Sequence, residues 1–216
     1  MYLYIFVEII YLILILINFI TDKGFNILNI GPIMISIIYS LISRKKNERG
    51  KLYLVLSLVF SLSGDIFFIL LNKSTLGVAS FILVQLCYLL YLKDKLSNKI
   101  LLLGLLNIII CSVFGKNILI IESIIYGIIF IINIVFSFKN IKINKTSHLF
   151  LIALLALLIC DINIAIIKSF DLSKTLNIIC NSIEWISYTI NLIIITLLAN
   201  GLIGKKNKHL KNVYCR

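Results

Sequence analysis

Between its apolar runs, the sequence lacks any segment long enough to fold around a hydrophobic core of its own. Its 216 residues are 61% hydrophobic, whereas soluble domains are about 45–50% apolar. It also contains only one proline and nine acidic residues. This composition excludes a soluble globular protein and predicts an all-α, polytopic membrane helical bundle with a single domain.

Cysteine and histidine are too few and too scattered to form a recognisable site. The five cysteines show no CxxC pair and no Cys/His spacing, and four of them lie in apolar runs, where cysteine behaves as a small hydrophobic residue. His148 and His209 lie at a membrane edge and in the tail, and Ser61 and Ser63 have no histidine nearby. We therefore predict no disulfide framework, no metal site, no other cofactor and no serine-hydrolase triad.

The N-terminus lacks the basic segment of a secretory signal peptide. The first basic residue is Lys23, and Glu8 interrupts the apolar run, so we expect this run to be retained as a membrane-spanning helix. A crossing needs about 20 apolar residues. On that measure eight spans are predicted: residues 2–20, 25–43, 52–71, 76–92, 99–115, 118–138, 148–167 and 176–199.

Basic residues are absent from the interior of every predicted span. Sixteen of the 21 Lys and Arg residues fall in alternate loops and in the tail from Lys205, and five fall on the other side, so the net charge of +12 does not indicate nucleic-acid binding. The positive-inside rule predicts cytoplasmic termini, with a transmembrane domain over residues 1–204 and a basic cytoplasmic tail over 205–216. We expect a multi-pass protein of a cell membrane, the plasma membrane of a bacterium, with lipid as a partner.

Acidic residues, in contrast, do occur inside the spans. A carboxylate in hydrocarbon costs about 2.5–3.5 kcal/mol on insertion scales, so each needs a reason to be there. Glu8 and Glu122 lie near span ends, where a structural role with the head group close to the interface is favoured. For Glu184 a structural and a functional role are equally open, whereas Asp65 and Asp161 are the strongest functional candidates.

Asp65 and Asp161 occupy comparable positions in two spans that run in the same direction. At 1.5 Å per residue, both lie about 20 Å from the cytoplasmic face. The following spans bring Gln85 and Glu184 to a similar depth, so the four side chains are expected to share one layer. Helical spacing puts further polar side chains on faces that meet a neighbouring helix or a cavity: Tyr88, Tyr126, Tyr188 and Asn191.

The sequence resembles the YhhN-type lysoplasmalogenase family, whose members are eight-span membrane proteins. The resemblance covers nearly the whole chain, and the matching residues are Gly64-Asp65, Gly77, Phe81, Gln85, Tyr88, Cys160-Asp161, Ala165, Tyr188 and Asn191. Gly31 stands where the family often has lysine. Gln85, Cys160 and Asn191 replace the more frequent histidine, serine and glutamine, while both aspartates are kept.

The resemblance implies hydrolysis of the vinyl ether bond of lysoplasmalogens to a fatty aldehyde and a glycerophospho-base. This reaction needs a proton delivered to carbon, a stabilised oxocarbenium-like cation and added water, which a carboxyl group and a carboxylate can supply together. Asp65 and Asp161 would then be the acid/base pair. The remaining candidates would contact a lysophospholipid-type substrate or orient water: Gln85, Tyr88, Tyr126, Glu184, Tyr188 and Asn191.

Two other functions fit the same buried acids. A transporter or lipid-binding membrane protein would use them as a proton or cation relay. A structural or assembly subunit would need them for stability rather than for turnover. Replacing either aspartate by asparagine distinguishes these functions, because each predicts the loss of a different property.

Overall fold

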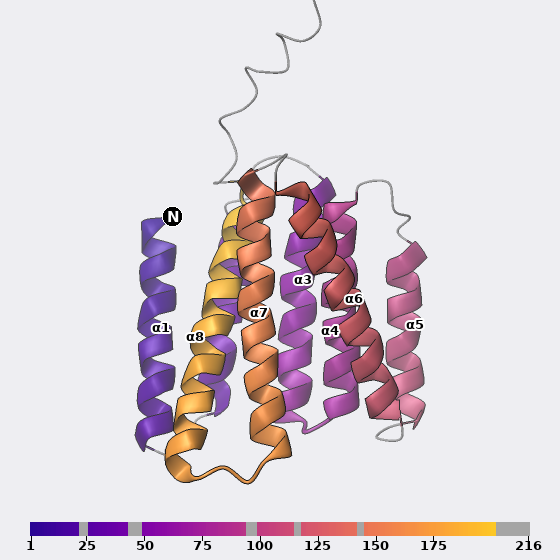
Figure 1. The fold of residues 1–216 in the computed structure, drawn as a ribbon. Coiled ribbons are helices and arrows are strands. Elements are labelled where there is room, and N and C mark those ends of the chain that lie inside the picture. Colours follow the sequence, from indigo (N-terminus) through magenta and orange to yellow (C-terminus); the bar gives the residue numbers. More distant parts are fainter. Residues whose placement is uncertain (22–25, 43–48, 94–98, 115–117, 142–144, 202–216) are drawn as a thin grey trace, which may run out of the picture.

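A computed structural model describes residues 1–21, 26–42, 49–93, 99–114, 118–141 and 145–201 (Figure 1). The predicted basic tail, 205–216, and most of the basic loops that determine the predicted orientation lie outside these residues. Throughout the described residues the regular secondary structure is helical, which confirms the all-α prediction.

Eight α-helices occur in the described residues. They are α1 (Tyr2–Thr21), α2 (Gly31–Ile42), α3 (Arg49–Asp65), α4 (Ser74–Leu92), α5 (Lys99–Phe114), α6 (Leu119–Asn140), α7 (Lys145–Ser169) and α8 (Lys174–Ala199). A 3-10 helix, η1 (Asn26–Ile30), precedes α2, and a π-helix, η2 (Ile66–Leu70), continues α3.

Six helical segments in the described residues are long and apolar enough to cross a membrane. They are those of α1, α3 with η2, α4, α6, α7 and α8, while α2 and α5 belong to shorter apolar segments. A membrane helical bundle is therefore supported, and eight complete crossings stay a prediction. The predicted span 25–43 is shorter as an α-helix because Pro32, which lacks an N–H group and suits a first helical turn, lies at the start of α2.

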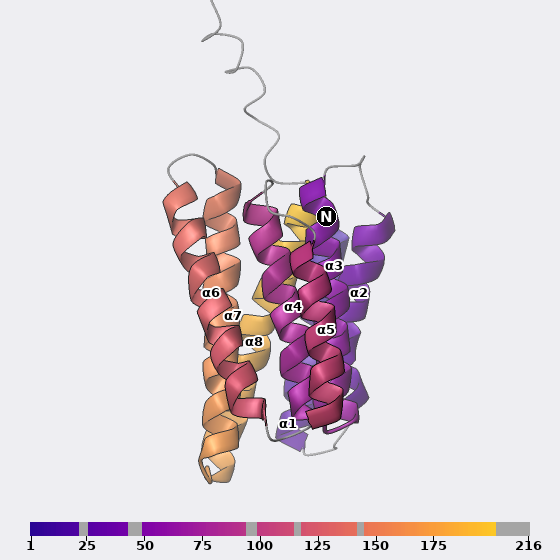
Figure 2. The same ribbon diagram turned by 90° about the vertical axis from the view of Figure 1, so that its right-hand side faces the viewer.

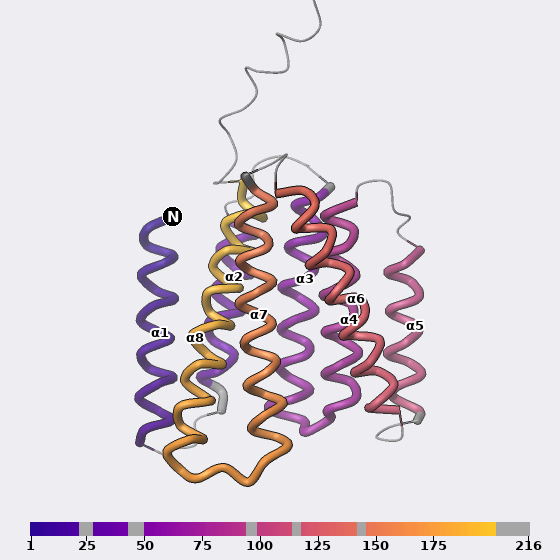
Figure 3. Tube along the Cα trace, viewed as in Figure 1, coloured from indigo at the N-terminus to yellow at the C-terminus, as the bar shows by residue number. Residues whose placement is uncertain are grey.

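The helices lie side by side and alternate in direction (Figures 1 and 3). The start of α1 and the end of α8 lie at the same end of the bundle, here called the N-terminal end. Helix α4 packs against α3, α5 and α6, and α8 packs against α1, α2, α3 and α7. Turning the molecule shows α6 and α7 together on one side (Figure 2). Helices α4 and α8 are therefore the two that join the bundle together.

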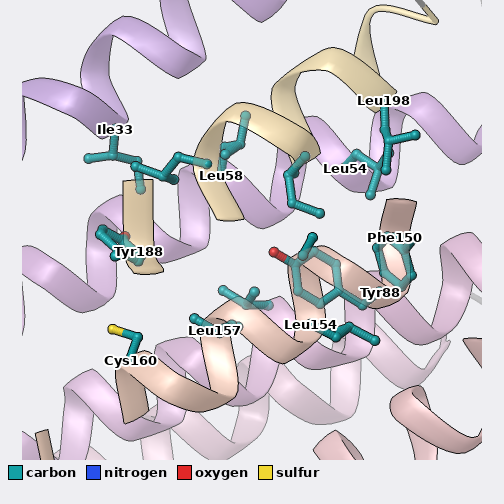
Figure 4. Close-up of a cluster of buried hydrophobic side chains, with 14 of the residues drawn as sticks. Ile33, Leu54, Leu58, Tyr88, Phe150, Leu154, Leu157, Cys160, Tyr188 and Leu198 are labelled. Carbon is teal, nitrogen blue, oxygen red and sulfur yellow. The ribbon is translucent and has the colours of Figure 1, made fainter. Parts of the chain in front are cut away.

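The main apolar core lies between α3, α4, α7 and α8 (Figure 4). Leu54 and Leu58 of α3 contribute to it, and the ring of Tyr88 meets that of Phe150 edge-on at 5.2 Å. Figure 4 places Tyr188 and Cys160 at the end of this cluster away from Phe150. The core thus holds the four helices that carry most of the candidate site residues.

Candidate functional site

Asp65 lies where α3 passes into the π-helix η2. The amide of Leu71 donates to the carbonyl of Ile66, five residues back, at 3.1 Å. Such π-helical turns are rare in proteins, and those that occur are often found at functional sites. The Asp65 side chain is 8% exposed, and its Oδ2 accepts a hydrogen bond of 2.7 Å from the hydroxyl of Tyr188 on α8. The end of α3 is therefore joined to α8 through this carboxyl group.

Two glycines bring α3 and α4 close together beside Asp65. A Cβ atom on Gly64 would lie 2.7 Å from the ring of Phe81, and one on Gly77 would lie 2.4 Å from the ring of Phe68. The two rings themselves pack with centroids 6.0 Å apart. Each helix thus receives an aromatic ring from the other at a glycine, which fixes how far α3 is rotated and where Asp65 points.

Asp161 on α7 accepts a hydrogen bond of 2.6 Å at Oδ2 from the hydroxyl of Tyr126 on α6. The Gln85 amide donates to the same hydroxyl at 3.4 Å. Asn133, two turns along α6 from Tyr126, donates to both the side-chain and the backbone oxygens of Gln85 at 2.9 Å. A continuous hydrogen-bonded chain therefore leads from Asn133 through α4 to Asp161.

Glu184 on α8 links the neighbourhoods of the two aspartates. Its partly buried carboxyl group interacts electrostatically with Asp65, with Lys168 and with Asp161. The buried thiol of Cys160 interacts electrostatically with all three acids. The structure therefore brings Asp65, Asp161 and Glu184 into one region, near which the side chains of α3, α7 and α8 converge.

Tyr88 and Asn191 lie deeper in the core. The Tyr88 side chain is 1% exposed, and its hydroxyl lies beside Ser57 and Asn191. Asn191 also donates to the carbonyl of Ala153 on α7 at 2.9 Å. Tyr88 interacts electrostatically with Asp161 as well. Tyr88 and Asn191 are thus part of the packed core next to the acids.

The two remaining intramembrane acids have partners outside this group of residues. Glu122 is 3% exposed and accepts a hydrogen bond of 2.7 Å from Asn107 on α5. Glu8 is fully buried and accepts one of 3.0 Å from Ser36 on α2. Each carboxyl group faces a neighbouring helix that offers a polar partner, which fits the structural role expected for these two acids.

Sequence reasoning identifies the acids and the tyrosines but not how they pair. Asn133 is absent from the predicted site, although its spacing of seven residues from Tyr126 places both on one face of α6. Within the described residues, no group of three or more His, Cys, Asp and Glu residues is placed to hold a metal ion. The arrangement offers carboxyl groups that can hold or release protons, each oriented by a phenol.

The comparisons with known proteins give one match. A sequence model described as the YhhN family matches residues 25–199. The matched range includes both aspartates and every helix from α2 to α8, while α1 precedes it. No curated protein and no solved structure gives a significant match.

Proposed function

We propose that this chain, which belongs to the YhhN family, is an integral-membrane hydrolase that cleaves the vinyl ether bond of lysoplasmalogens. One observation carries the proposal. Asp65 and Asp161 each accept a hydrogen bond from a tyrosine hydroxyl, and Glu184 interacts electrostatically with both. Two oriented carboxyl groups in one sheltered region are what acid/base catalysis of ether cleavage requires.

The proposed reaction starts with a proton transfer from a carboxyl group to the vinyl carbon farther from the ether oxygen. The electron pair of the C=C bond forms the new C–H bond and leaves an oxocarbenium-like cation. Water adds to the cationic carbon and gives a proton to the carboxylate. The resulting hemiacetal loses the glycerol oxygen, which takes up a proton, and the products are a fatty aldehyde and a glycerophospho-base. Carboxylate pairs drive glycoside hydrolysis through a similar cation.

The surroundings of the two aspartates suit this sequence of steps. A carboxylate held in an apolar site stabilises a developing positive charge more strongly than one in water. Tyr188 and Tyr126 fix the two carboxyl groups from neighbouring helices, so neither has to reorganise when charge develops.

The test is aldehyde release from lysoplasmalogen by the purified protein. Asp65→Asn and Asp161→Asn should each lower kcat by about 10²–10⁴-fold, because proton transfer by a positioned side chain contributes that much. Glu122→Gln is the matched control, since Glu122 is also a buried intramembrane acid but is hydrogen-bonded to Asn107 rather than to one of the site tyrosines. Equal, slow release by the wild-type and Asp65→Asn proteins would contradict the proposal.

The same variants distinguish hydrolysis from the relay function. A protein that conducts protons across liposome membranes, loses this flux in Asp161→Asn and releases no aldehyde would be a transporter. If both aspartate variants instead unfold while Glu122→Gln does not, the acids serve the assembly of the bundle.

A further inference from the structure

A second polar cluster lies between α1, α2 and α8, in the half of the bundle nearer the N-terminal end. It consists of Tyr4, Glu8, Ser36 and Thr196, all of them buried. Glu8 lies six residues from the start of α1, about 9 Å along the axis, whereas Asp65 lies about 24 Å along α3 from the same end of the bundle. The proposed catalytic chemistry uses none of these four side chains.

The hydroxyl of Tyr4 is at the centre of this cluster. It lies 2.8 Å from the Ser36 hydroxyl, which donates to Oε1 of Glu8 at 3.0 Å. Thr196 of α8 lies beside the same Tyr4 hydroxyl. The ring of Tyr4 stacks on that of Tyr39 with centroids 4.5 Å apart, which holds α1 against α2 at this level. Oxygen atoms from three helices therefore converge.

Two of these oxygens have no hydrogen-bond partner within the described residues. They are Oε2 of Glu8 and Oγ1 of Thr196, and both side chains are 0% exposed. An unsatisfied buried hydroxyl destabilises the fold, because it has given up its hydrogen bonds to water. An uncompensated buried carboxylate costs several kcal/mol. The cluster is thus incomplete as a purely structural contact, because two of its buried oxygens are left without a partner within the described residues.

We propose that Glu8 and Thr196, with the hydroxyls of Tyr4 and Ser36, bind a small monovalent cation such as Na⁺. The candidate ligands are all oxygens, which suit hard cations rather than the softer transition metals. One carboxylate balances one positive charge, whereas a divalent ion would leave a net charge among apolar helices. A water molecule alone would satisfy the hydrogen bonds but would not neutralise the carboxylate.

Further buried polar atoms lie between this cluster and the N-terminal end of the bundle. Ser40 follows Ser36 by one turn of α2, and Asn200 follows Thr196 by about one turn at the end of α8. Both side chains are buried, and within the described residues their oxygens have no hydrogen-bond partner. A cation that loses its hydration shell on entry would contact these oxygens one after another.

Cation binding is tested by thermal unfolding of the purified protein in detergent, followed by the fluorescence of Trp185, the single tryptophan. Wild-type Tm should rise saturably with NaCl relative to choline chloride at equal ionic strength. Glu8→Gln should abolish this rise, and Thr196→Val should weaken the apparent Na⁺ affinity roughly tenfold. Glu122→Gln, a buried acid with its own partner, should respond like the wild type.

A second measurement covers the case in which Glu8→Gln does not fold. Binding of ²²Na⁺ to the wild-type protein should then be saturable and be weakened in Thr196→Val. Equal Tm values in NaCl and choline chloride, or a saturable rise that persists in Glu8→Gln, would overturn the proposal. These outcomes do not depend on aldehyde release, so the two proposals can fail separately.

Discussion

The two tyrosine–aspartate hydrogen bonds each join one helix to another. Tyr188 reaches from α8 to the end of α3, and Tyr126 reaches from α6 to α7. In an apolar interior, a phenol that donates to a carboxyl group restricts both the rotamer and the protonation state of that group. We therefore regard the tyrosines as positioning residues for the aspartates.

Removing either phenol should impair catalysis without unfolding the protein. Hydrogen bonds to charged groups are worth about 1.5–3 kcal/mol, so Tyr188→Phe and Tyr126→Phe should each lower kcat roughly ten- to hundredfold. The pH–rate profile should shift as well, which a purely structural role would not produce. Tyr39→Phe, in the stacked pair near the N-terminal end, is the control. Unchanged kcat and pH profile would contradict the positioning role.

The sequence predicts the two aspartates because their positions deep inside apolar runs can be read from residue spacing alone. It does not predict their partners, because a hydrogen bond depends on how far each helix is rotated. Glu8 and Glu122 show the same limit. Their depth could be read from the sequence, but not the polar side chains of Ser36 and Asn107 that make burial tolerable.

At the level of helices, the contact between α3 and α4 determines the setting of Asp65. Gly77 accommodates the ring of Phe68, which belongs to the π-helix η2, and Gly64 accommodates Phe81. Helix boundaries follow from apolar run length, so most predicted spans agree with the helices to within a few residues. The π-helix could not be predicted, because the apolar residues 66–71 would fit an α-helix equally well.

Filling the space at Gly77 should disturb this contact. The Cβ of Gly77→Ala would lie 2.4 Å from two ring atoms of Phe68, so the ring or the helix must move, and overpacking of this kind costs about 1–3 kcal/mol. We expect a lower Tm and reduced turnover. Gly127→Ala on α6 is the control, because its Cβ would meet nothing within 4 Å. Restoration of Tm by Phe68→Leu in the Gly77→Ala background would identify the ring as the cause.

For the whole molecule, the alternating helices put the start of α1 and the end of α8 at the same end of the bundle. The charge asymmetry of the loops predicts that this end is cytoplasmic. The short connection at Asn72 and Lys73, where Asn72 adopts a positive φ of 52°, lies at the opposite end. The proposed catalytic region would then lie in the outer half of the membrane.

Reporter fusions test this orientation directly. A fluorescent protein fused after Arg216 should fluoresce, and alkaline phosphatase fused after Lys73 or Asp171 should be active, because the phosphatase folds only outside the cytoplasm. Phosphatase fused after Lys93 should be inactive. The reverse pattern would show that the positive-inside rule misassigns the chain and that the catalytic region faces the cytoplasmic leaflet.

As the predicted fifth crossing, α5 would impose a condition on the lipids beside it. Its 16 residues extend about 24 Å, against a hydrocarbon thickness of about 30 Å. If α5 crosses the membrane, the acyl chains next to it have to shorten to match, at a cost of a fraction of a kcal/mol for each ångström. Thin bilayers relieve this mismatch, so the protein should partition into the thinner regions of a membrane, with disordered lipid tails gathered along its α5 margin.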